Sequence, residues 1–330
     1  MSVRDFTITR PMKNKNIKFK EYENCLAGIY SDVHADGLMS RFILAPSDKR
    51  EVVIHNGEFH CDDVLAVALL RICVGDFNVI RTRNTEFFKE KSGRLVIDVG
   101  EGTFDHHGEA SYRFFTVLEN EEGKTFSVKH CGASLIARCL ERMNKLIIGK
   151  SLFNELFEVC IQDNGIIFDI DNVSRPRISF VHLFNKNWNE NRNDQDKAFE
   201  EAVSCVEMII RRLIASDNSD FAGEKICTTL DINQEVVELP CAGLPWVKYL
   251  ARDYCKAVYV IYQGDNDTWF LQCVPESSEN WMSKRKPLPE SWAFKKRDEG
   301  DFVFCHVGRF IAGFKTKEAA FAAAKEALSN

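Results

Sequence analysis

Hydrophobic and polar positions follow two different periods after residue 51. Short apolar runs bounded by polar or glycine residues predict buried strands, and apolar residues spaced three or four apart predict helices. In chain order these patterns predict a strand at 51–54, a helix at 62–74, a strand at 77–83, a short helix at 85–91 and a strand at 94–100. Strands that alternate with helices predict a parallel, wound sheet of the α/β class. Asp62 or Asp63 is expected as the N-cap of the first helix.

The pattern changes beyond about residue 220. Upstream, helices are predicted at 132–146, 151–165 and 196–214, the last strongly amphipathic. Downstream, the predicted elements are strands at 256–263 and 268–274 joined by a hairpin turn, a strand–turn–strand unit at 300–314 and a helix that Thr316 caps. We therefore expect an N-terminal extension at 1–50, a wound α/β domain at 51–220 and a smaller α+β domain at 221–330.

The composition narrows the class of protein. A net charge of −6 argues against a protein that coats nucleic acid through bulk positive charge, but not against an enzyme that contacts a few phosphates or binds metal ions. No apolar run approaches the ~20 residues of a membrane helix, so no membrane partner is expected. The twelve cysteines include no CxxC pair and are expected to be reduced. An intracellular protein is indicated, and the mildly basic first residues are compatible with cytoplasm, nucleus or mitochondrion.

Four segments of the sequence are rich in histidine and aspartate, the residue types that can act as metal ligands. "HNGEFHCDD" (55–63) follows the first predicted strand, and Asp98 lies in the otherwise apolar "VIDVG" of the third. "DHH" (105–107) and Asp163 of "QDNG" follow further along. Ligands bind beyond the carboxyl ends of strands in parallel sheets, so His55 and Asp98 are expected at one edge. The four segments supply enough carboxylates and imidazoles for two divalent cations with a bridging carboxylate.

The donor types indicate which metals and which chemistry to expect. Carboxylates mixed with imidazoles, without thiolates, favour Mn²⁺ or Mg²⁺ over a structural zinc site. Two such cations about 3.5–4 Å apart can bind a phosphate and activate water. The expected substrate is therefore a phosphoester or a phosphoanhydride. His34, His130 and His182 are expected to be structural or surface residues.

The combined motifs resemble those of the DHH phosphoesterase superfamily, which includes RecJ-like exonucleases, nanoRNases and family II pyrophosphatases. Together with "NKNWNENRNDQDKAFEEAV", "GLPWVKYL", "WFLQCVPE", "RKPLPESWA" and "FCHVGRFIAGFKTKEAA", they resemble more closely the melanocyte proliferating gene (Myg) family. The resemblance begins at about residue 52. It implies a metal-binding, DHH-like catalytic domain at 51–220, a substrate-binding domain at 221–330 and two Mn²⁺ or Mg²⁺ ions. It also implies a 3′→5′ exoribonuclease in RNA processing that acts on single-stranded RNA or a short oligonucleotide.

The resemblance also implies roles for individual residues. The metal ligands would be His55, His60, Asp62, Asp98, His106 and Asp163, with Asp98 shared by both ions. Asp98 and His107 would be catalytic, and His107 would face the substrate phosphate. The "GRFIAGF" turn that begins at Gly308 resembles the glycine segment that contacts substrate in the family. The basic residues of the smaller domain that are candidates to hold the RNA end are Arg285, Lys286, His306 and Arg309. Whether His60 or Asp63 completes the first metal site stays open.

Two other functions are compatible with the same residues. The first is hydrolysis of a small phosphorylated substrate such as pyrophosphate, a short oligonucleotide or a nucleoside bisphosphate. The second is a non-catalytic binding protein on the same fold, although the complete ligand set disfavours it. Metal-dependent hydrolysis of a chromogenic phosphodiester separates the enzymes from the binding protein.

Overall fold

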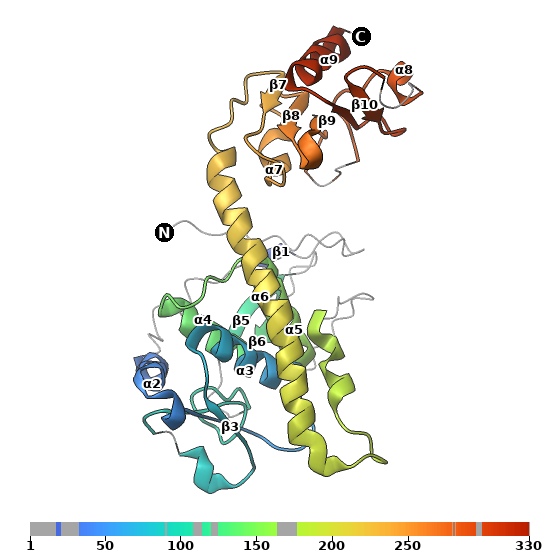
Figure 1. The fold of residues 1–330 in the computed structure, drawn as a ribbon. Helices are drawn as coiled ribbons and strands as arrows, with labels where there is room; N and C mark the ends of the chain where they lie inside the picture. Colours follow the sequence, from blue (N-terminus) through green and yellow to red (C-terminus); the bar gives the residue numbers. More distant parts are fainter. Residues whose placement is uncertain are drawn as a thin grey trace. The chain divides into compact units, whose positions relative to one another are not determined.

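The chain forms two compact units, Met1–Asp217 and Asn218–Asn330, in a computed structural model (Figure 1). The structure describes residues 18–20, 33–89, 91–107, 114–119, 125–163, 177–278, 280, 282–294 and 299–329. The division falls within helix α6 (Gln195–Cys227), which extends further than the helix predicted at 196–214.

A parallel three-stranded sheet organises the first unit. Strand β2 (Glu51–Ile54) lies between β3 (Asn78–Arg81) and β4 (Arg94–Val96), and both pairings are parallel. Helix α3 (Cys61–Val74) connects β2 to β3, and the short helix η2 (Thr85–Phe88) connects β3 to β4. The predicted alternation of strands and helices is confirmed for this part. Because the strands are parallel, their carboxyl ends lie at one edge of the sheet.

Both faces of this sheet are covered. Val52 and Ile54 of β2 belong to the main core with α3, while the alternate residue Val53 packs with Val96 against the segment that carries η2. Helix α3 packs against α4 (Gly132–Arg142) and α5 (Lys150–Asp163), as Figure 1 shows for α3 and α4. Burial on several sides explains why α3 is apolar around most of its circumference.

The segment before residue 51 contains a helix that the sequence pattern did not predict. Helix α2 (Val33–Leu44) buries Ala35, Leu38, Met39 and Phe42 in the main core. These positions have helical spacing, but they span barely two turns and Gly37 interrupts them, which weakened the signal. Strand β1 (Lys18–Lys20) pairs with β5 (Phe114–Glu119), which pairs with β6 (Thr125–Lys129), all antiparallel.

The first turn of α3 corrects the expected N-cap. The helix begins at Cys61, so His60 is the N-cap residue, and the prediction of Asp62 or Asp63 is wrong. Asp63 lies at the third helical position, where its Oδ2 accepts the backbone N–H of His60 at 3.0 Å. This is the reciprocal half of a capping box, in which an acidic side chain reaches back to the cap residue.

The second unit is built on a five-stranded mixed sheet. Its strands are β7 (Val236–Glu238), β8 (Tyr259–Gln263), β9 (Trp269–Cys273), β10 (Phe302–Cys305) and β11 (Ile311–Phe314), in the order β10-β11-β9-β8-β7. The β7–β8 pair is parallel and the others are antiparallel, which confirms the predicted strands at 256–274 and 300–314.

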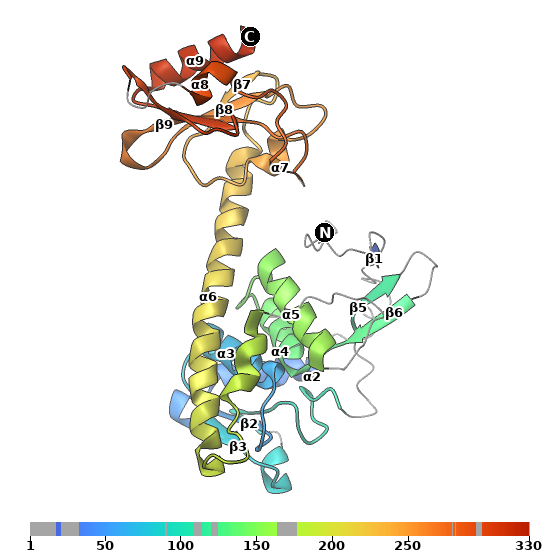
Figure 2. The same ribbon diagram turned by 90° about the vertical axis from the view of Figure 1, so that its right-hand side faces the viewer.

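Helix α9 (Lys317–Ser329) packs on this sheet against β8, β9 and β11 (Figure 2). Thr316 caps it as predicted, because its Oγ1 accepts the backbone N–H of Ala319 at 3.1 Å. The remaining short helices are η1 (Ser47–Lys49), η3 (Arg177–Phe184), η4 (Arg192–Asp194), α7 (Val247–Leu250), η5 (Asp265–Asp267) and α8 (Glu290–Ala293). None of the helices in the described residues has the length and apolar character of a membrane span.

Candidate metal centre

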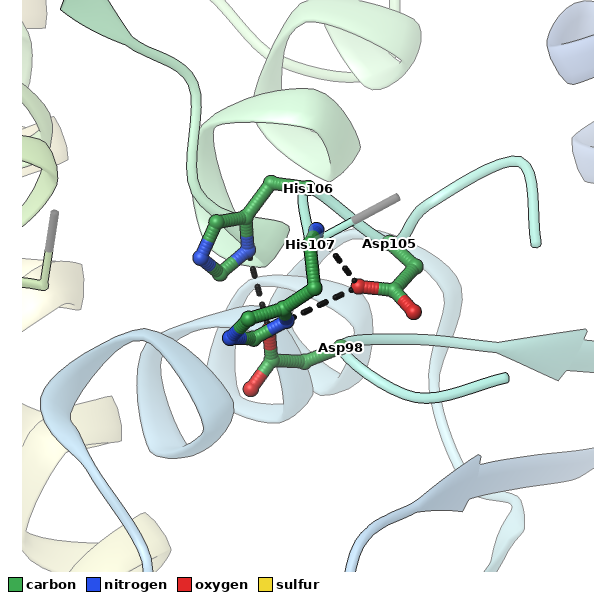
Figure 3. A group of neighbouring side chains, drawn as sticks. All are labelled: Asp98, Asp105, His106 and His107. Atoms are coloured by element: carbon green, nitrogen blue, oxygen red, sulfur yellow. Dashed lines mark hydrogen bonds and ion pairs between the residues drawn. The ribbon is translucent and has the colours of Figure 1, made fainter. Parts of the chain in front are cut away.

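The four ligand-bearing segments meet at the carboxyl edge of the parallel sheet. His55 directly follows β2, and Asp98 lies two residues beyond β4. Asp62 and Asp63 occupy the first turn of α3, and Asp163 is the last residue of α5. Figure 3 shows Asp98 facing the loop that carries residues 105–107. Parallel strand pairing and the packing of α3 and α5 thus assemble the site.

Asp98 has three imidazoles around its carboxylate. Its Oδ1 lies 2.9 Å from His106 Nδ1 and 3.2 Å from His107 Nδ1, and its Oδ2 lies 3.7 Å from His55 Nε2. The backbone of Asp98 has φ +56°, in the left-handed region that non-glycine residues seldom adopt. Strained backbone of this kind persists where surrounding contacts hold it and is concentrated at functional sites. The contacts from three segments provide that constraint here.

His106 and His55 each link two carboxylates. His106 Nε2 lies 2.7 Å from Asp163 Oδ2, so the ring spans the distance between Asp163 and Asp98. His55 Nε2 lies 2.9 Å from Asp63 Oδ2, which connects the end of β2 to the first turn of α3. The histidines and acids therefore form one continuous network across four segments of the chain.

Buried carboxylates crowd the first turn of α3. Asp62 and Asp63 are both fully buried, and neither oxygen of Asp62 meets a hydrogen-bond donor of normal geometry among the described residues. Burial, followed by repulsion from Asp98, raises the pKa of Asp62; burial also raises the pKa of Asp63 although His55 opposes it. Unpaired buried carboxylates are costly unless a cation accompanies them.

The histidines respond to these carboxylates in the opposite direction. Burial lowers the pKa of His106, but hydrogen bonds to Asp163 and Asp98 outweigh it and raise the pKa to about 9. Asp105 and Asp98 raise the pKa of His107 to about 10. Burial raises the pKa of Asp98, yet the two histidines hold it below its usual range. In the metal-free protein, protonated imidazoles supply positive charge beside the carboxylates. A metal ion would supply that charge instead and would release the protons.

The donor atoms fit divalent cations. The ligand atoms form four overlapping sets, and within each set all of the atoms lie within 4.8 Å of one another. The sets are Asp98, Asp105, His106 and His107; His55, His60 and Asp63; His60, Asp62 and Asp163; and Asp62, Asp63 and Asp98. All of these ligands offer oxygen or imidazole nitrogen, as Mn²⁺ and Mg²⁺ sites with some histidine require. The unpaired oxygens of Asp62 belong to two of the sets, so the residues present can hold metal ions.

Helix α4 approaches the cluster through a glycine. A Cβ on Gly132, the first residue of α4, would lie 3.0 Å from Ile97 Cγ2 and 3.5 Å from both Asp62 Oδ2 and the Cβ of Asp98. A larger residue would crowd these side chains. The close approach places the positive end of the α4 dipole beside two carboxylates, which favours their ionised forms.

The cluster opens into a cavity of about 710 Å³. His55, His60, Asp98 and His107 line it, together with Arg83 and Arg192 from other segments. The His107 side chain is 61% exposed, whereas those of His106 and Asp98 are almost fully buried. His107 is therefore the most exposed member of "DHH".

The substrate residues expected in the smaller domain lie in the second unit, on loops and turns. Arg285 uses its guanidinium to bind backbone carbonyls of Arg252, Cys255 and Ala257 at 2.6–2.7 Å, and Lys286 Nζ donates to the Leu328 carbonyl at 2.6 Å. These contacts hold the local fold.

A turn between β10 and β11 carries the other three substrate residues. Nδ1 of His306 accepts the Gly308 N–H at 2.9 Å, and Arg309 closes the turn with φ +54°. His306 is exposed and Arg309 half-buried.

Residues from distant segments support the "HNGEFH" loop, and the sequence pattern did not predict them. Arg81 at the end of β3 donates to the Gly57 carbonyl at 2.6 Å and to Asp196 Oδ1 at 2.7 Å. Asn185 accepts the Phe59 N–H at 3.0 Å and donates to the Phe59 carbonyl at 2.9 Å. The only sequence signals were an arginine at a strand end and the polar run "NKNWNENRNDQ", and neither indicates its distant partner.

The chain is similar to known proteins over most of its length. The family model MYG1_exonuc, described as an uncharacterised protein family (UPF0160), matches residues 51–328. Human "MYG1 exonuclease" is 28% identical over 323 residues, covering 83% of this chain and 85% of the relative. A Caenorhabditis elegans MYG1 protein is 26% identical (83% and 94% covered), and a Chlamydia muridarum MYG1 protein is 28% identical (82% and 93% covered).

A solved structure of a pGpG-specific phosphodiesterase, PggH from Vibrio, is 10% identical, with a TM-score of 0.28 over 85% of this chain and 99% of the other.

Proposed function

Because this chain belongs to the MYG1_exonuc family, we propose that it is a metal-dependent phosphodiesterase that removes nucleotides from the 3′ end of single-stranded RNA or a short oligonucleotide. The observation that carries the proposal is the convergence of the predicted ligands His55, His60, Asp62, Asp98, His106 and Asp163 within overlapping sets of ligand atoms. The name of the human relative, an exonuclease, agrees with this chemistry.

We assign two Mn²⁺ or Mg²⁺ ions to these residues. Asp98 is the natural shared ligand, because it contacts residues of both halves of the cluster, His55 on one side and His106 on the other. His60 and Asp63 both belong to a set with His55, so either can complete the first site. When bound, divalent cations neutralise phosphate charge and lower the pKa of water, which is the chemistry that hydrolysis requires.

His107 is the proposed contact to the substrate phosphate. Asp105 Oδ1 accepts the backbone N–H of His107 at 2.9 Å and also lies 2.9 Å from Nδ1 of the His107 ring. The backbone N–H of Glu101 donates to Asp105 Oδ2 at 2.7 Å, which fixes the carboxylate in turn. Nδ1 thereby donates to Asp105, and because this carboxylate and that of Asp98 raise the pKa of His107 to about 10, the protonated ring also carries a hydrogen on Nε2 that can donate to a non-bridging phosphate oxygen. Preorganised donors of this kind stabilise charge that develops in the transition state.

The size of the cavity favours a short substrate or the end of a longer one. About 710 Å³ is within the range of pockets that bind a single small molecule. A net charge of −6 also argues against an extended electrostatic track for RNA. Hydrolysis of a small phosphorylated compound, such as a dinucleotide or pyrophosphate, is therefore the second candidate. The first candidate, the exoribonuclease, would act in RNA processing inside the cell.

The test is hydrolysis of a 5′-labelled single-stranded RNA by the purified protein with Mn²⁺. Parallel reactions contain EDTA or the Asp98→Ala variant, and a variant of an exposed acid, Asp76→Asn, controls for charge loss. We expect a ladder that shortens from the 3′ end with the unmodified protein and the control variant only.

Other outcomes discriminate between the candidates. Intact RNA together with cleavage of pyrophosphate or a dinucleotide would establish the site with a different substrate. Cleavage that persists in Asp98→Ala would contradict the assigned centre. Absence of cleavage for every substrate would leave a binding protein on this fold.

A further inference from the structure

Two arginines line the cavity beside the acidic cluster. Arg83 follows β3 and Arg192 belongs to η4, so they come from segments that supply no predicted metal ligand. The other charged residues that line the cavity include the carboxylates of Glu58, Asp98, Glu101 and Asp105. Two guanidinium groups that line the same cavity as these acids provide donors to which an anion can bind.

The backbone around Arg83 is firmly fixed. The Thr82 N–H donates to the Ile54 carbonyl at 2.8 Å, which continues the β2–β3 pairing up to His55. The next residue, Asn84, donates its N–H to Thr82 Oγ1 at 3.1 Å, and its side chain caps η2. Arg83 therefore projects from an ordered strand end at the same edge of the sheet as the predicted ligands.

The Arg83 side chain is available for a ligand. It is exposed, and within the described part of the chain it makes no hydrogen bond or ion pair. Arg192 differs, because its Nη2 lies 3.3 Å from Glu58 Oε1. Both members of that pair are more than half exposed, and exposed pairs are weak. A phosphate can therefore compete with Glu58 for Arg192 while Arg83 binds it without losing an existing partner.

We propose that Arg83 and Arg192 form a subsite for a second phosphate of the substrate, beside the phosphate that is hydrolysed. The inference rests on the proposed phosphodiesterase function and deepens it by defining the substrate class. The protein would prefer nucleotides that carry at least two phosphates over a dinucleoside monophosphate. Guanidinium groups suit this task because they donate paired hydrogen bonds to phosphate oxygens.

Three dinucleotides test the subsite with Mn²⁺ present. ApA has only the phosphate to be cleaved, pApA adds a 5′-phosphate and ApAp adds a 3′-phosphate. The unmodified protein should cleave at least one two-phosphate compound with a higher kcat/KM than ApA, and the compound preferred identifies the side on which the subsite lies. Arg83→Ala should reduce that preference about tenfold to a hundredfold, the range for a lost charge-assisted hydrogen bond.

Further variants refine the expectation. Arg83→Lys should retain part of the preference, because it keeps the charge and loses the paired donors. Arg192→Ala should have a smaller effect than Arg83→Ala, since Glu58 already shares its guanidinium. Arg212→Ala removes an exposed arginine that does not line the cavity and should leave the preference as it is in the unmodified protein.

The outcomes separate this inference from the proposed function. An equal preference in the unmodified protein and Arg83→Ala, with cleavage retained, would overturn the subsite alone. If the unmodified protein cleaves none of the three compounds and also leaves the 5′-labelled RNA intact, the proposed function fails. Calorimetric titration of pApA and ApAp into both proteins then still decides the subsite, because equal affinities would overturn it and weaker binding by Arg83→Ala would support it.

Discussion

Replacing Asp62 by asparagine should stabilise the metal-free protein. The Asp62 side chain is fully buried, both of its oxygens are without donors of normal geometry among the described residues, and Asp63 and Asp98 lie close by. Asparagine keeps the shape and removes the charge. Asparagine is still a buried polar group, so the gain comes from the removed charge alone. Two carboxylate charges about 4.8 Å apart repel each other by about 3 kcal/mol at an effective dielectric constant of about 20, and the raised pKa of Asp62 relieves part of this repulsion. We therefore expect Asp62→Asn to gain roughly 1–3 kcal/mol in EDTA.

Mn²⁺ should reverse this order of stability. A ligand present at about a thousand times its Kd stabilises the folded state by about 4.1 kcal/mol. The unmodified protein should gain that amount, whereas Asp62→Asn lacks a ligand and should gain much less. For a unit of this size, each kcal/mol corresponds to a Tm change of about 2–4 °C. The reversal is therefore large enough to measure.

The assay is thermal unfolding of both proteins in EDTA and in a Mn²⁺ titration. The exposed acid Asp76 supplies the matched control, and Asp76→Asn should follow the unmodified protein in both conditions. Destabilisation of Asp62→Asn in EDTA, or an equal Mn²⁺-dependent gain in both proteins, would refute the assignment of Asp62 as a buried ligand.

Three further substitutions test the surrounding fold. Arg81→Met removes the hydrogen bonds to the Gly57 carbonyl and to Asp196, together with contacts to two phenylalanine rings. We therefore expect the free energy of unfolding in urea to fall by about 2–4 kcal/mol and the amides of the 56–60 loop to exchange faster. Phe42→Ala should cost about 3–5 kcal/mol by the same assay if α2 belongs to the core, and a loss under 1 kcal/mol would contradict that packing. Burial raises the pKa of Asp36, but hydrogen bonds from Arg142 outweigh it and the net pKa is lowered. The stability that this pair contributes is therefore present above the unfolded-state pKa and lost as pH falls through the folded-state pKa. Asp36→Asn should lower the free energy of unfolding by about 0.5–1 kcal/mol at pH 7 and by progressively less in acid. A loss of stability that does not depend on pH would argue against the pair.

Local periodicity was sufficient to predict much of the fold. The runs at 51–54 and 94–100 contain buried parallel strands, and the positions of His55 and Asp98 beyond their ends follow from the rule for parallel sheets. These features depend on neighbouring residues and on a general topological preference. They could therefore be inferred without knowing any distant contact.

Features that depend on distant residues were not predictable. Helix α2 gains its stability from packing against elements that lie far along the chain, so its short apolar stripe was a weak signal. The support of the "HNGEFH" loop by Asn185 joins residues 126 positions apart. The left-handed backbone of Asp98 also depends on contacts from other segments. Sequence periodicity carries no record of such pairings.

The central claim is that the four segments together bind a pair of divalent cations. Its most direct test is the number of Mn²⁺ ions bound per chain, measured by equilibrium dialysis of the unmodified protein and of Asp98→Ala. We predict two ions per chain for the unmodified protein and at most one for the variant, because Asp98 contacts residues of both halves of the cluster. Equal numbers for the two proteins, or no bound Mn²⁺ in the unmodified protein, would contradict the claim.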